Sequence, residues 1–454
     1  MTIFRAPMLT AALLVSACAA FPELDGKPVA ATRAVEFQAS GTRAGDAPVW
    51  ALDFGDSALR RMLAEADRVG LDAASARARF RAADLALDQV RAGSGPGYAS
   101  DASAERGKLA VNASLRFEPD LAGRFDAALR AATLEHSASG LDLMMARRTL
   151  AREITQGWVA LAEARGDAIR AGTDIAAEEN ALRLLRLRRD AGEITGADLA
   201  ARDQAVVRAR ADAAGAAGRV ALAEARLRAL GVQKVPPAIS LKRASRPAVP
   251  ARTDLAATQA TAPVCAAWLR FRAADASRAE ALAAARPRLV VTSSLSATAK
   301  TLAGLIAGNA VAVTNSVRIE GNILDNGQSR RTVDRARLAV AQAEIEWMQA
   351  RNRADISALE AVTARQSAEA GLDAALSGWR NARADLDRVR ARQVAGVADA
   401  LDLAEAERGL TSAQQGVDRS RAEAFRAAAA LHDALPPVAA SCTSATAPVP
   451  AQTL

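Results

Sequence analysis

The stretches RRDAGEITGADL (188–199) and RQVAGVADALDL (392–403) lie 204 residues apart in a chain of 454 residues. Aligned without a gap, they share an arginine, an Ala-Gly pair and an Asp-Leu pair. Glycine just after a helix commonly closes it, because glycine adopts a positive φ without strain. The chain therefore makes the same turn twice, which indicates an internal repeat.

The repeat extends beyond this turn, since at the same offset Gly123 matches Gly327 and Leu227 matches Leu431. We expect each copy to contain a helix, two strands, a very long helix, the turn and a returning helix. The expected organisation is a first repeat at 55–231, a proline-rich linker at 232–263, a second repeat at 264–435 and a disordered tail at 436–454.

The long helices are expected at about 121–190 and at 328–394, two stretches without proline. Within the first, Leu150, Ile154 and Trp158 recur at helical spacing. Each would measure about 100 Å at 1.5 Å per residue and needs partner helices along its length. Further helices are expected at 56–92, 197–230, 264–286 and after Gly396 up to 435, with Leu59, Leu63, Ala66, Leu85 and Val90 on the spacing of the first.

Four strands are expected, at 98–105, 109–117, 288–299 and 311–324. In the second of them, alternate residues are apolar: Leu109, Val111, Ala113, Leu115 and Phe117. The alternative is a long coiled-coil protein in which these stretches are only linkers. Turn residues and alternation fall at equivalent places in both halves, which favours strands.

The composition excludes several function classes. Aromatic residues make up only 3% of the chain, and the net charge of +8 comes from basic residues interspersed with acids, which disfavours nucleic-acid binding. No His, Cys and carboxylate cluster has metal-ligand spacing, and no phosphate-binding glycine loop or nucleophile elbow occurs. We therefore expect a non-enzyme with no catalytic residues, no metal site and no cofactor.

The N-terminal residues are typical of an exported protein. Arg5 precedes a short apolar stretch, which indicates a signal peptide at 1–17. Val15-Ser16-Ala17-Cys18 resembles the bacterial lipobox, in which Cys18 would carry lipid and anchor the chain. A plain signal peptide is the alternative, and an extended segment is expected at 18–54. Cys265 and Cys442 could pair, but Cys442 lies in the tail, so we expect no pairing.

Four strands with an apolar face cannot form a closed membrane sheet alone, because small membrane barrels need at least about eight strands. Three copies of the chain would supply twelve. We therefore expect a mainly α protein with a small β part. Its four strands per protomer would contribute to a trimeric twelve-stranded barrel, and its long helical hairpins would continue below that barrel as a hollow cylinder.

The chain resembles the outer membrane efflux proteins, the TolC-like family, and more closely their lipoprotein branch. RFEPDLAGR (116–124) and ILDNGQSR (323–330) are similar to the stretches where strands enter the family's long helices. The two turns quoted above are similar to its helix tips. The resemblance implies that the twelve-stranded barrel lies in the outer membrane and that the helical hairpins form a periplasmic tunnel. It also implies that the trimer is a passive exit duct that works with a periplasmic adaptor, or membrane fusion protein, and an inner-membrane pump.

The same resemblance implies two sets of site residues. Asp198, Asp402 and Glu405 match acids that narrow the periplasmic entrance, and an ordinary solvated helix face is the alternative. The adaptor would dock at the turns, at Ala191, Gly192, Ile194, Ala395, Gly396 and Val397. The competing hypothesis for the whole chain is an anchored periplasmic coiled-coil structural or adaptor protein without a barrel.

Overall fold

The computed structural model describes residues 54–435 except 94, 106–107, 238, 240, 242–257, 259–260, 307–310, 322–324 and 399. Both repeats fall within one unit, Gly45–Leu454. The predictions for the signal peptide, Cys18, the tail with Cys442, and most of the segments 18–54 and 232–263 concern residues outside those described.

Two helices of 67 residues dominate the structure, α5 (Arg124–Asp190) and α10 (Gln328–Val394). Both their first and their last residues lie 204 positions apart, and α10 has the bounds that the sequence predicts. Each begins after a glycine with a φ of 76°, Gly123 and Gly327. The repeat read from the two turns is therefore a repeat of the main structural element.

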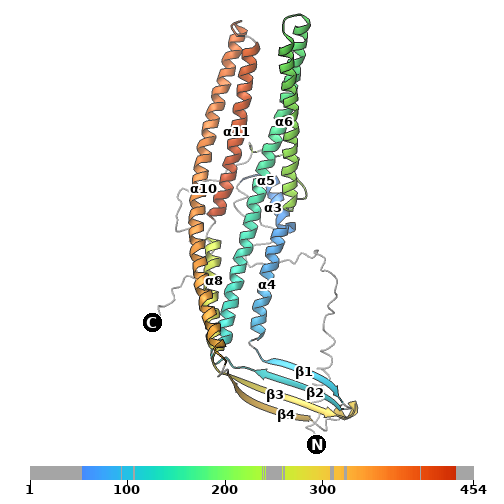
Figure 1. Cartoon of the computed structure of the whole chain (residues 1–454), viewed down its shortest axis with the longest axis vertical. Coiled ribbons are helices and arrows are strands. Elements are labelled where there is room, and N and C mark those ends of the chain that lie inside the picture. Colours follow the sequence, from blue (N-terminus) through green and yellow to red (C-terminus); the bar gives the residue numbers. More distant parts are fainter. Residues whose placement is uncertain are drawn as a thin grey trace. The chain divides into compact units, whose positions relative to one another are not determined.

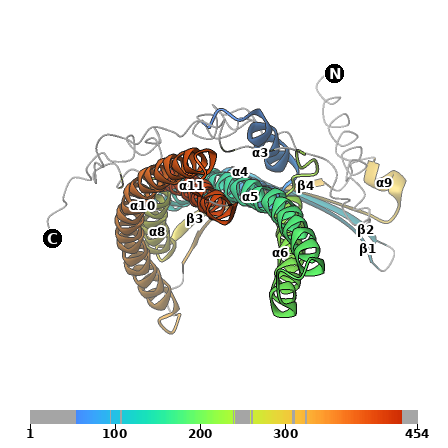
Figure 2. The ribbon, with the colours of Figure 1, turned by 90° about the horizontal axis from the view of Figure 1, so that it is seen from above.

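Shorter helices support the long ones over their whole length (Figure 1). They are α3 (Ser57–Val69), α4 (Leu71–Gly93), α6 (Gly196–Ala229), α8 (Ala262–Ala284) and α11 (Ala400–Ala434). The short α9 (Leu302–Ile306) contacts β3 instead. Along α5, α4 packs near the sheet and α6 towards the far tip; along α10, α8 and α11 take the same two places. Viewed from above, α10, α11, α5 and α6 follow one another along a curved wall (Figure 2).

The single helix predicted for 56–92 is wrong, because α3 and α4 are separated at Gly70, whose ψ is 134°. An added Cβ at Gly70 would lie 2.5 Å from the carbonyl oxygen of Ala66 and 3.1 Å from that of Leu230. The break therefore depends on a close approach by the end of α6, which local spacing does not show. Leu85, predicted on the apolar spacing, is 57% exposed.

The main core lies where α3, α5, α6 and α11 meet. Trp158 of α5 is fully buried, and its ring packs at 5.9 Å on that of Phe425 and at 6.4 Å on that of Phe54. The predicted α5 spacing is confirmed, since Leu150, Ile154, Trp158 and Leu161 all lie in this core. Small residues elsewhere let the helices approach closely, as Ala368, Val417, Ala424 and Ala427 do between α10 and α11.

One antiparallel sheet lies at the end of the helices opposite the two tips (Figure 1). Its strands are β1 (Gly97–Glu105), β2 (Lys108–Phe117), β3 (Arg288–Ala299) and β4 (Val311–Glu320), in that order across the sheet. All four predicted strands are present, although β4 ends before 324. The central pair β2–β3 joins the two repeats, and β1 and β4 are the edges.

Candidate functional site

The two tips have the same backbone hydrogen bonds. At the end of α5, the N–H of Gly192 donates to the carbonyl of Arg189, and that of Glu193 donates to the carbonyl of Arg188. At the end of α10, Gly396 donates to Gln393 and Val397 donates to Arg392. This pattern is the Schellman motif. It requires a residue with positive φ, and Gly192 and Gly396 have φ values of 79° and 73°.

The first predicted entrance acid has a local role at its helix terminus. Asp198 is the third residue of α6 and forms a capping box with Thr195, whose hydroxyl donates to the carboxylate at 2.6 Å. The side-chain hydrogen bond from Thr195, followed by the one from its backbone N–H, lowers the pKa of Asp198. The carboxylate is therefore ionised and held close to the first tip.

The other two predicted entrance acids begin α11. Asp402 lies in its first turn, Glu405 follows one turn later, and both are exposed. Residues three apart share a helix face, so the pair can present two carboxylates to one side. Asp198 belongs to α6 of the other hairpin. The three acids therefore lie beside two separate tips at one end of the helices (Figure 1).

The predicted docking residues form most of the surface of the two turns. Ala191, Gly192, Ala395 and Gly396 are exposed, Val397 is 65% exposed and Ile194 is half-buried. A Cβ added to Gly192 or Gly396 would meet no atom within 4 Å. The space above both turns is therefore open within the protomer.

Three apolar side chains near the tips were missed by the sequence reading. Val394 is 91% exposed beside the second turn, and Leu184 and Leu187 are 63% and 65% exposed on the last turns of α5. Leu184 and Leu187 lie three residues apart, so they can form one apolar patch. Their spacing alone would have placed them equally well in a core.

The sheet separates apolar from polar residues on its two faces. Cross-strand partners share a face, and the register pairs Leu115 with Tyr98 and Ser293, and Ser293 with Asn315. The face containing Leu115 carries Tyr98, Leu109, Val111, Leu115, Phe117, Leu289, Val291, Leu295, Val311, Val313, Val317 and Ile319. We call it the apolar face. Its exposed members range from 37% for Val111 to 80% for Tyr98.

The opposite face, the polar face, carries Asp101, Ser103, Lys108, Asn112, Ser114, Arg116, Arg288, Thr292, Ser294, Ser296, Thr298, Thr314, Ser316, Arg318 and Glu320. Val290 is its one large apolar residue and is buried. This arrangement confirms the predicted alternation in β2 and extends it to the whole sheet. A face of exposed Val, Leu and Ile requires an apolar environment, because each such side chain gains about 1.5–3 kcal/mol on full burial.

Charged residues join the sheet to the long helices. Arg288 donates to Glu320 at 2.9 Å and lies 3.5 Å from Glu118, and Glu118 accepts from Arg124 at the start of α5 at 2.8 Å. Arg116 donates to Glu320 at 3.2 Å. We call these five residues the junction network. It connects β2, β3, β4 and α5, so it fixes the sheet relative to the helices.

Both long helices are also capped by an aspartate at this junction. Asp120 accepts hydrogen bonds from the N–H groups of Arg124 and Asp126, and Asp325 accepts from those of Gly327 and Ser329. Burial acts to raise the pKa of Asp120, but these backbone hydrogen bonds outweigh it, so the pKa is lowered. The charged caps complement the positive ends of the helix dipoles.

Within the described residues, no three His, Cys, Asp or Glu side chains gather closely enough to hold a metal ion. Of the helices described, none is both long enough and apolar enough to cross a bilayer. Cys265 is disulfide-bonded. The prediction concerned a pair between Cys265 and Cys442, and Cys442, like Cys18, lies outside the described residues, so it stays a prediction.

No family model matches the chain, and no curated protein matches it in sequence. Solved structures do resemble it. The open-state MtrE outer membrane channel of Neisseria gonorrhoeae superimposes with a TM-score of 0.74 at 21% identity, over 88% of this chain and 93% of that one. The CmeC outer membrane channel of Campylobacter jejuni gives 0.75 at 15% identity, over 88% and 90%.

The outer membrane protein VceC of Vibrio cholerae gives a TM-score of 0.71 at 20% identity, over 85% of this chain and 98% of that one. The chain has the fold of these outer membrane channels. The predicted fold class is thereby confirmed for one protomer, with long helical hairpins and four strands. The two helix tips and the amphipathic sheet lie at opposite ends of the chain's helices. Both ends carry candidate functional residues.

Proposed function

We propose that the chain is one protomer of an outer-membrane exit duct, a passive trimeric channel that continues from the outer membrane into the periplasm. It would be the outer-membrane component of a tripartite efflux or secretion system. The observation that carries this proposal is the sheet. It exposes an apolar face, and the outer edges of β1 and β4 have no partner strand among the described residues.

The dimensions of the sheet suit a bilayer. Its strands contain 9, 10, 12 and 10 residues, and a tilted strand of about 9–11 residues spans the hydrocarbon core. The apolar face would meet lipid, and the polar face with its Ser, Thr and Asn side chains would meet water. Unpaired backbone groups at an open edge cost several kcal/mol each in hydrocarbon, so both edges need partner strands.

Other copies of the chain are the simplest source of those strands. Two copies would give eight strands, and the interior of an eight-stranded barrel is filled by its own side chains. Three copies would give twelve strands and leave a lumen. The curved wall of α10, α11, α5 and α6 in Figure 2 would then close in the same way, as a helical cylinder below the barrel.

The tips would be the periplasmic mouth of the duct. In this proposal, Asp198, Asp402 and Glu405 place carboxylates near the entrance, where a ring of negative charge would favour cations over anions. The exposed turn residues, together with Val394, Leu184 and Leu187, would receive a periplasmic adaptor that connects the duct to an inner-membrane pump. Lipid attached to Cys18 would add an anchor in the same membrane.

The competing hypothesis is an anchored periplasmic coiled-coil protein without a barrel. It gives no role to an apolar sheet face with exposed Val313, Val317 and Ile319. It also leaves unexplained why the two strands of each repeat pair with one another in a single four-stranded sheet.

Purification from outer membranes in a mild detergent tests the proposal. We expect an oligomer three times the protomer mass that dissociates only on heating, and stepwise conductance after insertion into a planar lipid bilayer. A chain that fractionates as a monomer without detergent, and forms no conductance, would contradict the proposal and support the coiled-coil alternative.

A further inference from the structure

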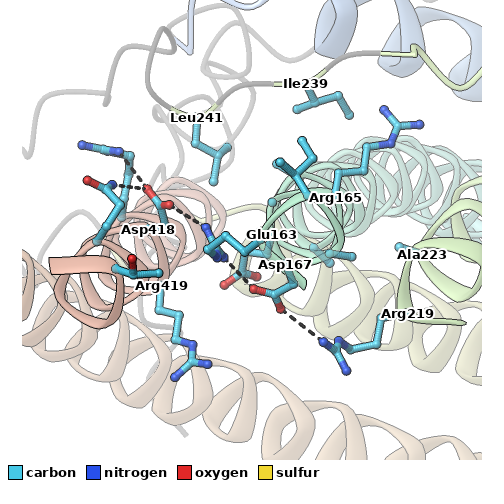
Figure 3. A pocket seen from close by; sticks show the side chains of 18 of the residues that line it. Glu163, Arg165, Asp167, Arg219, Ala223, Ile239, Leu241, Asp418 and Arg419 are labelled. Atoms are coloured by element: carbon cyan, nitrogen blue, oxygen red, sulfur yellow. Dashed lines mark hydrogen bonds and ion pairs between the residues drawn. The ribbon is translucent and has the colours of Figure 1, made fainter. Parts of the chain in front are cut away.

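A second candidate site lies midway along the helices, where the two hairpins meet. It is a pocket of about 960 Å³ between α5, α6, α10 and α11, with Ile239 and Leu241 from the segment after α6 on one side. Figure 3 shows these two apolar side chains on the opposite side of the pocket from Arg219 and Arg419. We call it the inter-hairpin pocket. Its volume is in the range of small-molecule sites.

The walls of the inter-hairpin pocket carry an excess of positive charge. Six arginines line it (Arg165, Arg170, Arg219, Arg226, Arg419 and Arg421) but only three carboxylates do (Glu163, Asp167 and Asp418). With six arginines and three carboxylates, the formal net charge of the lining is 6 − 3 = +3. An electropositive concave surface concentrates anions.

The three carboxylates are already engaged. Asp167 and Asp418 both accept from Arg170, at 2.6 and 2.9 Å, so that one guanidinium links the two hairpins (Figure 3). Glu163 is paired with Arg426 of α11. These pairs satisfy the negative charge inside the pocket. Of the other lining arginines, Arg165 is paired with Glu224 and Arg421 with Asp418.

Two further arginines of the lining have no carboxylate partner among the described residues. Arg226 of α6 and Arg419 of α11 are exposed, and neither makes an ion pair with any residue that the structure describes. They come from different hairpins and line the same pocket. Arg219 is only loosely held, 3.5 Å from Asp167. The pocket therefore presents guanidinium groups from both sides to whatever occupies it.

Large apolar side chains lie beside these cations. Ile169 of α5 and Leu222 of α6 line the pocket while 72% and 51% exposed, and the Trp379 ring contributes from α10. Apolar surface next to unpaired guanidinium groups matches a ligand with an apolar body and an anionic head. Guanidinium binds carboxylate and sulfonate oxygens through paired N–H donors, and its flat face stacks on aromatic rings.

We propose that the inter-hairpin pocket binds amphipathic organic anions, with the anionic head between Arg226 and Arg419 and the apolar body against Ile169, Leu222 and Trp379. The occupied site would bridge α6 and α11 and so tie the two hairpins together. Binding does not require conduction, so this proposal can fail while the exit-duct function holds, and the reverse is also true.

Isothermal titration calorimetry of the purified full-length protein in non-ionic detergent tests the proposal, with 2-naphthalenesulfonate as the probe and protein-free micelles as the blank. We expect saturable binding that weakens with added salt. The double variant Arg226→Gln/Arg419→Gln should bind roughly tenfold more weakly, because two charge-assisted contacts are lost at a partly exposed site. Uncharged 2-naphthalenemethanol should bind weakly to both proteins.

Arg79→Gln/Arg335→Gln is the matched control. Both residues are exposed, both lie away from the pocket, and neither has an ion-pair partner within the described structure. This variant removes the same charge and should bind the probe as the wild type does. Equal weakening by both double variants would show a general charge effect and overturn the proposal. Absent or unsaturable binding, or equal binding of the uncharged analogue, would overturn it too.

Discussion

Arg116 and Glu320 are 204 residues apart and form an ion pair, with Nη2 of the arginine 3.2 Å from Oε2 of the glutamate. They occupy matching positions at the ends of β2 and β4, the second strand of each repeat. The two repeats, whose matching turns lie at the tips, therefore also contact each other directly at the other end of the helices. Arg288 of the intervening β3 donates to the same glutamate.

The junction network predicts a small stability loss for Arg288→Ala. This change removes the contacts of Arg288 with Glu320 and Glu118. Because the Arg288 side chain is 46% exposed, solvent screening limits the loss to about 0.5–1 kcal/mol. Arg318→Ala, on the same face but without an ion-pair partner in the described structure, should be neutral. Heat dissociation of the proposed trimer measures both, and equal effects would argue against a role for the network.

The second tip predicts separate effects for two substitutions of Gly396. Gly396→Ala and Gly396→Arg both force an L-residue to a φ of 73°, which costs about 1–2 kcal/mol. Only arginine also fills the open space above the turn. Both variants should assemble, but only Gly396→Arg should lose the periplasmic adaptor, as measured by cross-linking and mass spectrometry. Equal adaptor recovery from the two variants would contradict docking at this turn.

The entrance hypothesis predicts altered ion selectivity for Asp402→Ala/Glu405→Ala. Loss of two carboxylates per protomer should lower the preference for cations by about twofold or more. Asp373→Ala/Glu360→Ala removes two exposed acids of α10 well before its tip and should change selectivity less. Reversal potentials across a planar bilayer under a salt gradient measure both. If the α11 variant keeps the wild-type selectivity and conductance, these acids do not line the entrance.

Glu163 predicts a pH-dependent contribution to stability. Burial raises the pKa of its carboxyl above the ordinary value of 4.5, although Arg426 acts in the opposite direction. A raised pKa means that the folded protein holds the proton more tightly than the unfolded chain does. The stabilising contribution is therefore present below the ordinary pKa and is lost as pH rises through the raised one.

Glu163→Gln mimics the protonated state at every pH. Its melting temperature relative to the wild type should therefore increase as the pH rises above the ordinary pKa of 4.5, because only the wild type loses the proton. Far-UV circular dichroism during heating measures the difference. A difference that stays constant with pH would mean that Glu163 has no raised pKa in the folded protein.

The aromatic core predicts a large loss of stability for Trp158→Ala. Its ring is fully buried against Phe54 and Phe425, and its truncation should cost about 3–5 kcal/mol. Trp158→Phe should cost less than Trp158→Ala, because phenylalanine keeps one buried ring and because the indole Nε1 has no acceptor among the described residues, so no hydrogen bond is lost. Denaturant unfolding measures the free energy of unfolding of both variants. Similar losses of this free energy would contradict the prediction and would mean that the exact shape of the indole ring matters more than the buried area.

The match between two stretches 204 residues apart predicted the repeat. The spacing of neighbouring residues predicted the bounds of α10, the four strands and the buried face of α5, where Leu150, Ile154, Trp158 and Leu161 lie in the core. The break at Gly70 was not predicted, because it depends on Leu230 about 160 residues later. Contacts of that range have no local signature.

The candidate sites divide in the same way. The turn glycines follow from the repeated sequence, and the acids beside them follow from the resemblance to outer membrane efflux proteins. The inter-hairpin pocket did not, because Arg226 and Arg419 belong to different repeats and look like ordinary surface residues until α6 and α11 are placed in space. The exposure of Val394 also depends on which neighbours are present, which spacing does not determine.

Because α5 and α10 both contain 67 residues, the two tips lie at the same distance along the helices from the sheet. Removing seven residues from only one of these helices would shorten it by about 10 Å and stagger the two tips by that amount. Removing seven from both, with matching cuts in α6 and α11, would keep the tips level and shorten the reach from the membrane. Insertions and deletions in this chain are therefore expected to occur in pairs, one in each repeat.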